Sequence, residues 1–116
     1  MVKYKYPIFE NEWEEAIRYD KYKHIDMKTW VDIVGNGYVV NHSDIEHMLH
    51  NVDLDFDNLE MDKQIRFNEM FGKTYIEMPI ALKINNNHYD LLGGNTRIAG
   101  LKKHNESDIP IWVISY

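Results

Sequence analysis

The spacing of apolar residues predicts helices in the first half of the chain and strands in the second half. Apolar positions that recur every three or four residues are typical of an amphipathic helix, and short apolar runs are typical of buried strands. On this basis we expect helices over residues 12–19, 27–34, 44–50, 59–71 and 95–103. We expect strands over residues 78–84, 88–92 and 109–114, a short β segment over 38–40, and an extended run over 53–57.

Short polar residues and glycines mark the expected helix ends. Asp26 is placed to cap the second helix, and Gly72 is placed to end the fourth. Other candidate caps are Asn11 with Glu14 in a capping box, Asn41 or Ser43, and Asp57 or Asn58. The side chains expected to face the core from the first, second and fourth helices are Trp13, Ala16, Ile17, Trp30, Ile33, Val34, Leu59, Ile65, Phe67, Met70 and Phe71.

These elements indicate a single α+β domain with a small mixed sheet. A chain of 116 residues is long enough for one domain with a modest core. We divide it into a helical N-terminal region, residues 1–58, that caps the sheet, and a core of residues 59–116. Residues 109–114 are almost all apolar, so we expect this last strand to lie in the interior of the sheet.

Composition narrows the classes of function. Hydrophobic residues make up 44% of the chain, which favours a globular protein. The formal net charge of −6 argues against a broad nucleic-acid surface, although one nucleotide needs only a local positive pocket. The absence of cysteine excludes disulfides and thiol catalysis. With no long apolar run and no apolar leader at the N-terminus, we expect a cytoplasmic protein that does not bind membranes, in a bacterium or a phage-infected cell.

The most informative stretch is the joint between residues 89–92 and the helix that follows. Gly93 and Gly94 allow a sharp turn and a close approach of a ligand to the backbone. The first amides of a helix have no partner inside it, and with the helix dipole they favour anions. Side chains of the first turn add hydrogen-bond donors. We therefore predict a phosphate site at Gly93, Gly94, Asn95, Thr96 and Arg97.

Several alternatives stay open at this joint. Arg97 is also able to bridge to a carboxylate such as Asp90, in which case the turn is purely structural. Lys63 and Arg66 lie on the preceding helix and either reach the pocket or are surface charges. A general base would have to come from another part of the chain, so no catalytic residue is assigned. The candidates are Asp53, Asp55, Glu69, Asp90 and His88, the last of which is also an ordinary hairpin residue.

Two metal sites are suggested by spacing, and both have a simpler interpretation. His47 and His50 are three residues apart and share a helix face, so with His42 and Asp53 or Asp55 they form a candidate zinc set. The alternating aspartates of residues 53–57 are similar to the start of a calcium loop, but the glycine and glutamate that such a loop needs are missing. We assign no metal ligand. We interpret the histidines as a solvated polar face, and residues 53–57 as an extended strand with one apolar face that ends in an N-cap at Asp57 or Asn58.

The C-terminal half resembles the ParB/sulfiredoxin superfamily. The resemblance lies in Met78-Pro79-Ile80-Ala81-Leu82, in residues 89–99 with their Gly-Gly-Asn-Thr-Arg turn, and in the proline-led strand of residues 109–114. It implies this fold for residues 59–116 and a nucleotide, CTP or ATP with Mg²⁺, as ligand at the turn. A weak Mg²⁺-dependent nucleotide hydrolase or phosphotransferase is the activity it allows.

Departures from the family pattern limit this expectation. Sulfiredoxins have a catalytic cysteine where this chain has Asn95, so that activity is excluded. ParB-type CTPases have glutamate and arginine at the positions of Asn95 and Thr96. The alternatives are therefore a non-catalytic phage or bacterial adaptor that binds a protein through an acidic, aromatic surface, and a ParB-like DNase, which the acidic charge disfavours.

Overall fold

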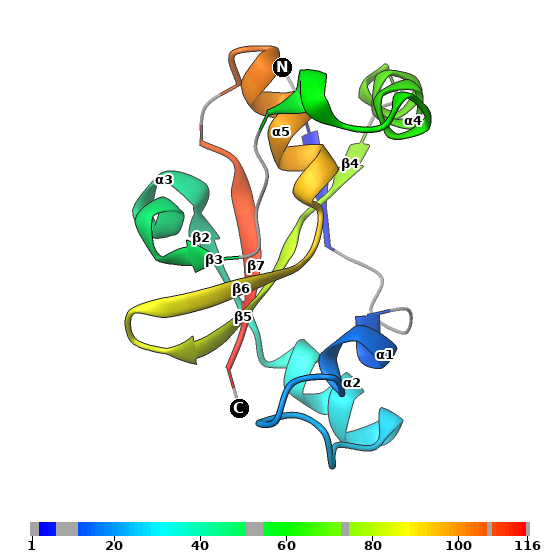
Figure 1. Cartoon of the computed structure of the whole chain (residues 1–116). Coiled ribbons are helices and arrows are strands. Elements are labelled where there is room, and N and C mark those ends of the chain that lie inside the picture. Colours follow the sequence, from blue (N-terminus) through cyan, green and yellow to red (C-terminus); the bar gives the residue numbers. More distant parts are fainter. Residues whose placement is uncertain (1–2, 7–11, 51–54, 73–74, 107, 116) are drawn as a thin grey trace.

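The computed structural model describes residues 3–6, 12–50, 55–72, 75–106 and 108–115. Its centre is a five-stranded mixed sheet in the order β2-β7-β5-β6-β3 (Figure 1). β5 and β7 are parallel and so are β3 and β6, whereas β2 is antiparallel to β7 and β5 is antiparallel to β6. The strands are β2 Tyr38–Asn41, β3 Leu49–His50, β5 Ile80–Asn85, β6 His88–Gly93 and β7 Pro110–Ile114. Because β7 lies between two other strands, the expectation of an interior last strand is confirmed.

A second, two-stranded parallel sheet pairs the start of the described chain with a segment from its second half. It consists of β1 Lys3–Lys5 and β4 Tyr75–Glu77. The strand expected over residues 78–84 begins later, because a short connection separates β4 from β5. The helices are α1 Trp13–Ala16, α2 Met27–Gly35, α3 His42–Ile45, α4 Met61–Phe71 and α5 Asn95–Lys103, with 3₁₀ turns η2 Glu46–Met48 and η3 Phe56–Asn58.

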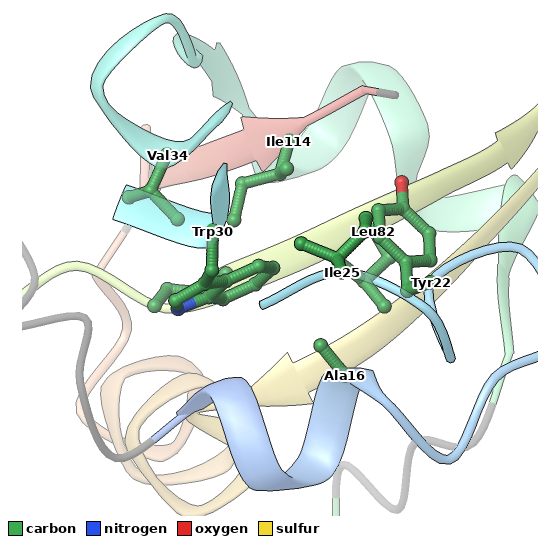
Figure 2. Packing of buried hydrophobic residues seen from close by; sticks show 8 residues of the cluster. Ala16, Tyr22, Ile25, Trp30, Val34, Leu82 and Ile114 are labelled. Atoms are coloured by element: carbon green, nitrogen blue, oxygen red, sulfur yellow. The ribbon is translucent and has the colours of Figure 1, made fainter. Parts of the chain in front are cut away.

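One face of the large sheet is covered by α1, α2 and the turns between them (Figure 2). Side chains alternate along a strand, so Ile80 and Leu82 of β5 and Ile114 of β7 point to this face. The side chains packed on them are Ala16, Tyr22, Ile25, Trp30 and Val34. Residues from the first half of the chain thus cover this face, and the same half also supplies β2 and β3 to the sheet itself.

The opposite face carries α3 and α5. Ala81, Leu91, Ile111 and Val113 of the sheet pack there with Ile45 and Ile98. A third cluster joins α4 to α5, with Phe67 of α4 at its centre. A Cβ on Gly100 of α5 would lie 2.5 Å from the Phe67 ring, so the missing side chain lets the two helices approach closely. This contact fixes α4 beside the start of α5, where the candidate site lies.

Two helix predictions are confirmed closely and three need correction. The helices over 27–34 and 95–103 are present, and Asp26 accepts a hydrogen bond from the Thr29 amide at 2.8 Å. The first helix is only Trp13–Ala16, because the chain then turns to bury Tyr22 and Ile25 in the core. Its expected cap, Asn11, lies outside the described residues.

The third predicted helix is wrong over its second half. Asn41 caps α3, but the chain passes through η2 into β3, where Leu49 pairs with Tyr89 and is buried. Tertiary pairing overrides the helical spacing here. The extended run over 53–57 is also wrong where it is described, since Asp55 caps η3 and Phe56 is buried; residues 53 and 54 lie outside the described part.

The fourth helix begins at Met61 rather than residue 59 and ends before Gly72, as expected. Ile65, which we expected to face the core, is 50% exposed. Of α4 only Phe67 is fully buried, because this helix touches the rest of the molecule along one narrow stripe. Within the described residues no helix is long and apolar enough to cross a membrane.

Candidate anion-binding cleft

A cleft of about 420 Å³ opens where β6 ends and α5 begins, beside α4. Its floor is formed by Leu91, Leu92 and the turn residues Gly93 and Gly94, followed by the first turn of α5. Its wall is one side of α4, which contributes Phe67 and Met70 and the cationic side chains of Lys63 and Arg66. All five residues of the predicted phosphate site, Gly93, Gly94, Asn95, Thr96 and Arg97, line this one cleft.

The shape of the turn depends on Gly94, the N-cap of α5. Its φ is +105°, a conformation that side chains with a Cβ rarely adopt. The Gly94 carbonyl accepts the first bond of the helix, from the Ile98 amide at 2.9 Å. The amides of Thr96 and Arg97 come before Ile98 in the chain, so they have no partner within the helix. No side chain of the N-cap covers this end of the helix, so the positive end of its dipole faces the cleft residues.

Arg97 has a structural role through partners that the sequence did not indicate. Its Nη1 donates to the carbonyl oxygen of Glu77 at 2.9 Å and lies 3.4 Å from that of Met78. The guanidinium therefore ties α5 to the end of β4. Burial lowers the pKa of Arg97, while the nearby carboxylates of Glu77 and Glu12 raise it. It stays protonated at neutral pH, so it contributes charge to the cleft while holding the fold together.

The alternative of a structural Arg97 gave Asp90 as an example of its carboxylate partner, and that partner is wrong: the carboxylates that act on Arg97 are those of Glu77 and Glu12. Asp90 is buried, and its Oδ1 lies 2.7 Å from Nε2 of His88 instead. His88 and Asp90, which were both candidates for a general base, are therefore in contact with each other. Among the others, Asp55 accepts bonds from η3, Glu69 lies on the exposed side of α4, and Asp53 is outside the described residues. None of these residues is assigned a catalytic role.

Glu12 brings a carboxylate against the turn, a contact that was not predicted from the sequence. If Gly93 had a Cβ, that atom would lie 3.0 Å from Oε2 and 3.1 Å from Oε1 of Glu12. Burial raises the pKa of Glu12; Arg97 lowers it, and Glu77 and Glu15 raise it further. No periodicity connects residue 12 to residue 93, so only the folded chain reveals the contact.

The cations on α4 reach the cleft, as one of the two sequence interpretations proposed. Arg66 lies 3.8 Å from Asp62 on the exposed side of the helix. No ion pair is found for Lys63 within the described residues. Lys63 is half-buried and lies beside the open end of a helix, so it adds a positive charge to the cleft, although the whole protein carries a net charge of −6.

The proposed histidine cluster does not share a helix face. His42 begins α3, His47 is exposed on η2, and His50 belongs to β3. No three histidine, aspartate or glutamate side chains of the described part are placed to hold a metal ion. His42 is instead a buried side chain whose Nε2 has no hydrogen-bond partner among the described residues and whose Nδ1 lies 3.8 Å from Glu46.

The burial of His42 predicts a dependence of stability on pH. Burial lowers the pKa of His42, Lys102 lowers it further, and Glu46 opposes them. The unfolded chain binds the proton more readily, so stability is full above about pH 6.5 and decreases as the pH falls below it. We expect His42→Gln to flatten the dependence of the free energy of unfolding on pH below about pH 6.5.

Urea unfolding at several pH values measures this effect. His47→Gln is the matched control, because His47 is exposed on the neighbouring turn. If the two variants and the wild type showed the same slope, His42 would not be the group that takes up the proton.

Neither a family model, nor a curated protein, nor a solved structure matches the chain. The order strand, hairpin, strand, helix and strand from β5 to β7 is the order that the ParB/sulfiredoxin resemblance implied. Membership of that superfamily stays a prediction.

Proposed function

We propose that the protein binds a phosphate-bearing small molecule, with a nucleotide such as CTP or ATP as the best candidate, in the cleft beside α5. The main support for this proposal is the cleft, which is lined both by the uncapped N-terminus of the nine-residue helix α5 and by Lys63 and Arg66. Helix amides and flexible cations are a recurrent combination for holding phosphate groups.

The size and lining of the cleft favour a ligand larger than phosphate. A volume of about 420 Å³ lies within the range of small-molecule sites. Met70, Leu91 and Leu92 give it an apolar side next to the cationic one. A nucleotide has matching parts, since its base is largely apolar on its faces and its phosphates are anionic. Mg²⁺ would enter with the nucleotide, and hydrolysis or phosphotransfer would be a further step for which no base is assigned.

Calorimetry with CTP, ATP and GTP in the presence of Mg²⁺ tests the proposal. We expect Lys63→Ala to weaken binding about tenfold, because it removes a cation from a partly desolvated cleft. Lys28→Ala is the matched control, since Lys28 is an exposed lysine on α2 and does not line the cleft. Equal affinity of the two variants would place the ligand elsewhere, and no heat with any nucleotide at two different temperatures would count against nucleotide binding.

The second candidate function is that of an adaptor for another protein. Its support is the exposed side of α4, where Met61 is 68% exposed and Ile65 is 50% exposed. Residues four apart share a helix face, so the two form an apolar pair at the surface. Proteins that bind partners often expose such groups, although single exposed apolar residues are common. The absence of nucleotide binding in the calorimetry would favour this candidate. A plasmid-nicking assay tests the DNase alternative.

A further inference from the structure

The contact of Glu12 with the glycine turn places an acidic group next to the cleft, although Glu12 is not one of the residues that line it. Gly93 lines the cleft, and the Glu12 carboxylate lies against the position that a Gly93 side chain would occupy. Arg97 also lines the cleft and interacts electrostatically with Glu12. An anion bound at the turn would therefore be separated from this carboxylate by little more than the backbone of one residue.

The charged groups around Glu12 come from three elements. Arg97 of α5 favours the ionised carboxylate, whereas Glu77 of β4 and Glu15 of α1 disfavour it. Partial burial disfavours it more strongly than any of them. The Arg97 guanidinium also contacts the carbonyl oxygens of Glu77 and Met78, so it does not interact with Glu12 alone.

We propose that Glu12 is a specificity-determining residue of the cleft, and that it makes the binding of a phosphate-bearing ligand depend on the uptake of a proton. The inference rests on the proposed function, because it requires an anion at the turn. Like charges at close range repel in a partly desolvated site, so a bound phosphate favours the neutral carboxyl form of Glu12.

The sign of the pH dependence follows from this linkage. If the bound state holds more protons on Glu12 than the free state, affinity is highest at low pH and decreases as the pH rises through the pKa of Glu12. Replacing the carboxylate by an amide of the same shape removes the repulsion. At a pH where Glu12 is ionised, we expect Glu12→Gln to bind about three to ten times more tightly than the wild type, as for two charges at moderate separation near a protein surface.

Calorimetry of ATP binding in two buffers with different ionisation enthalpies measures the proton uptake directly. ATP itself also exchanges protons with the buffer. The quantity to compare is therefore the difference in proton uptake between the wild type and each variant. We expect uptake in the wild type and in Glu12→Asp, which keeps a titratable carboxyl group, and less uptake in Glu12→Gln. Glu14→Gln is the matched control, because Glu14 is an exposed glutamate of α1 that is neither among the atoms nearest the Gly93 turn nor among the charged groups that act on Glu12. Thermal unfolding of each variant verifies that it is folded.

The outcomes separate this inference from the proposed function. Binding by all variants with the same proton uptake and the same affinity would overturn the role of Glu12 and leave the cleft as the binding site. A wild type and a folded Glu12→Gln variant that both fail to bind ATP, CTP or GTP would overturn the proposed function and this inference with it.

Discussion

Replacing Gly94 by alanine should lower the free energy of unfolding by about 2–4 kcal/mol, as two costs combine. The first is the φ of +105°, which an alanine adopts only with strain. The second is steric, because the new Cβ would lie 2.5 Å from Cβ and 2.8 Å from Cα of Pro79. The Cα is backbone, so it has no alternative rotamer, and the turn or the start of β5 must move.

Gly35→Ala is the control for this substitution. Gly35 is the last residue of α2, and no atom lies within 4 Å of the position that a Cβ would take there, so alanine should be neutral or slightly stabilising. Urea unfolding of both variants gives the two free energies. A loss below about 1 kcal/mol for Gly94→Ala would show that the turn is adaptable, and that its particular shape does not define the site.

Arg97→Met should lower the free energy of unfolding by about 2–3 kcal/mol, since hydrogen bonds from a charged donor contribute more than neutral ones. The substitution leaves the carbonyl oxygen of Glu77 without this donor, and it removes the cation that lies near Glu12 and Glu77. Methionine fills a similar volume, so the loss reports the guanidinium and not a cavity.

Arg18→Met is the matched control for the arginine. Arg18 is exposed and lies 3.5 Å from Glu15, so its loss should change stability by less than about 0.5 kcal/mol. If the two variants had equal stability while Arg97→Met bound nucleotide far more weakly, Arg97 would be a ligand-binding residue rather than a structural tie.

The parts of the fold that were predictable from the sequence are those with a strong local signal. Residues 95–103 form the expected helix because a glycine turn and a helical spacing agree there, and Asp26 caps α2 because an aspartate suits that position. The clustering of residues 93–97 at one cleft was predictable for the same reason, since a turn followed by a helix is a local feature. The position of Lys63 and Arg66 on an amphipathic helix left open whether they are surface charges or reach the cleft, and only the folded chain shows that they line it.

The parts that were missed depend on contacts between distant residues. Leu49 looks helical by spacing, yet it becomes part of a strand because Tyr89 of β6 lies beside it. Arg97 looks like an anion ligand by motif, yet it donates to the carbonyl of Glu77, twenty residues earlier in the chain. Glu12 could not have been associated with Gly93, because the separation of 81 residues leaves no pattern in the sequence.

Both outer strands of the large sheet come from the first half of the chain, so the second half depends on the first to complete its sheet. β2 and β3 belong to the first fifty residues, yet they form opposite borders of the sheet, next to β7 and β6 (Figure 1). A chain divided near residue 58 would thus expose unpaired backbone along both β6 and β7. Open borders of this kind attract strands from other molecules, so the N-terminal region protects the C-terminal half from association as well as covering one face of it.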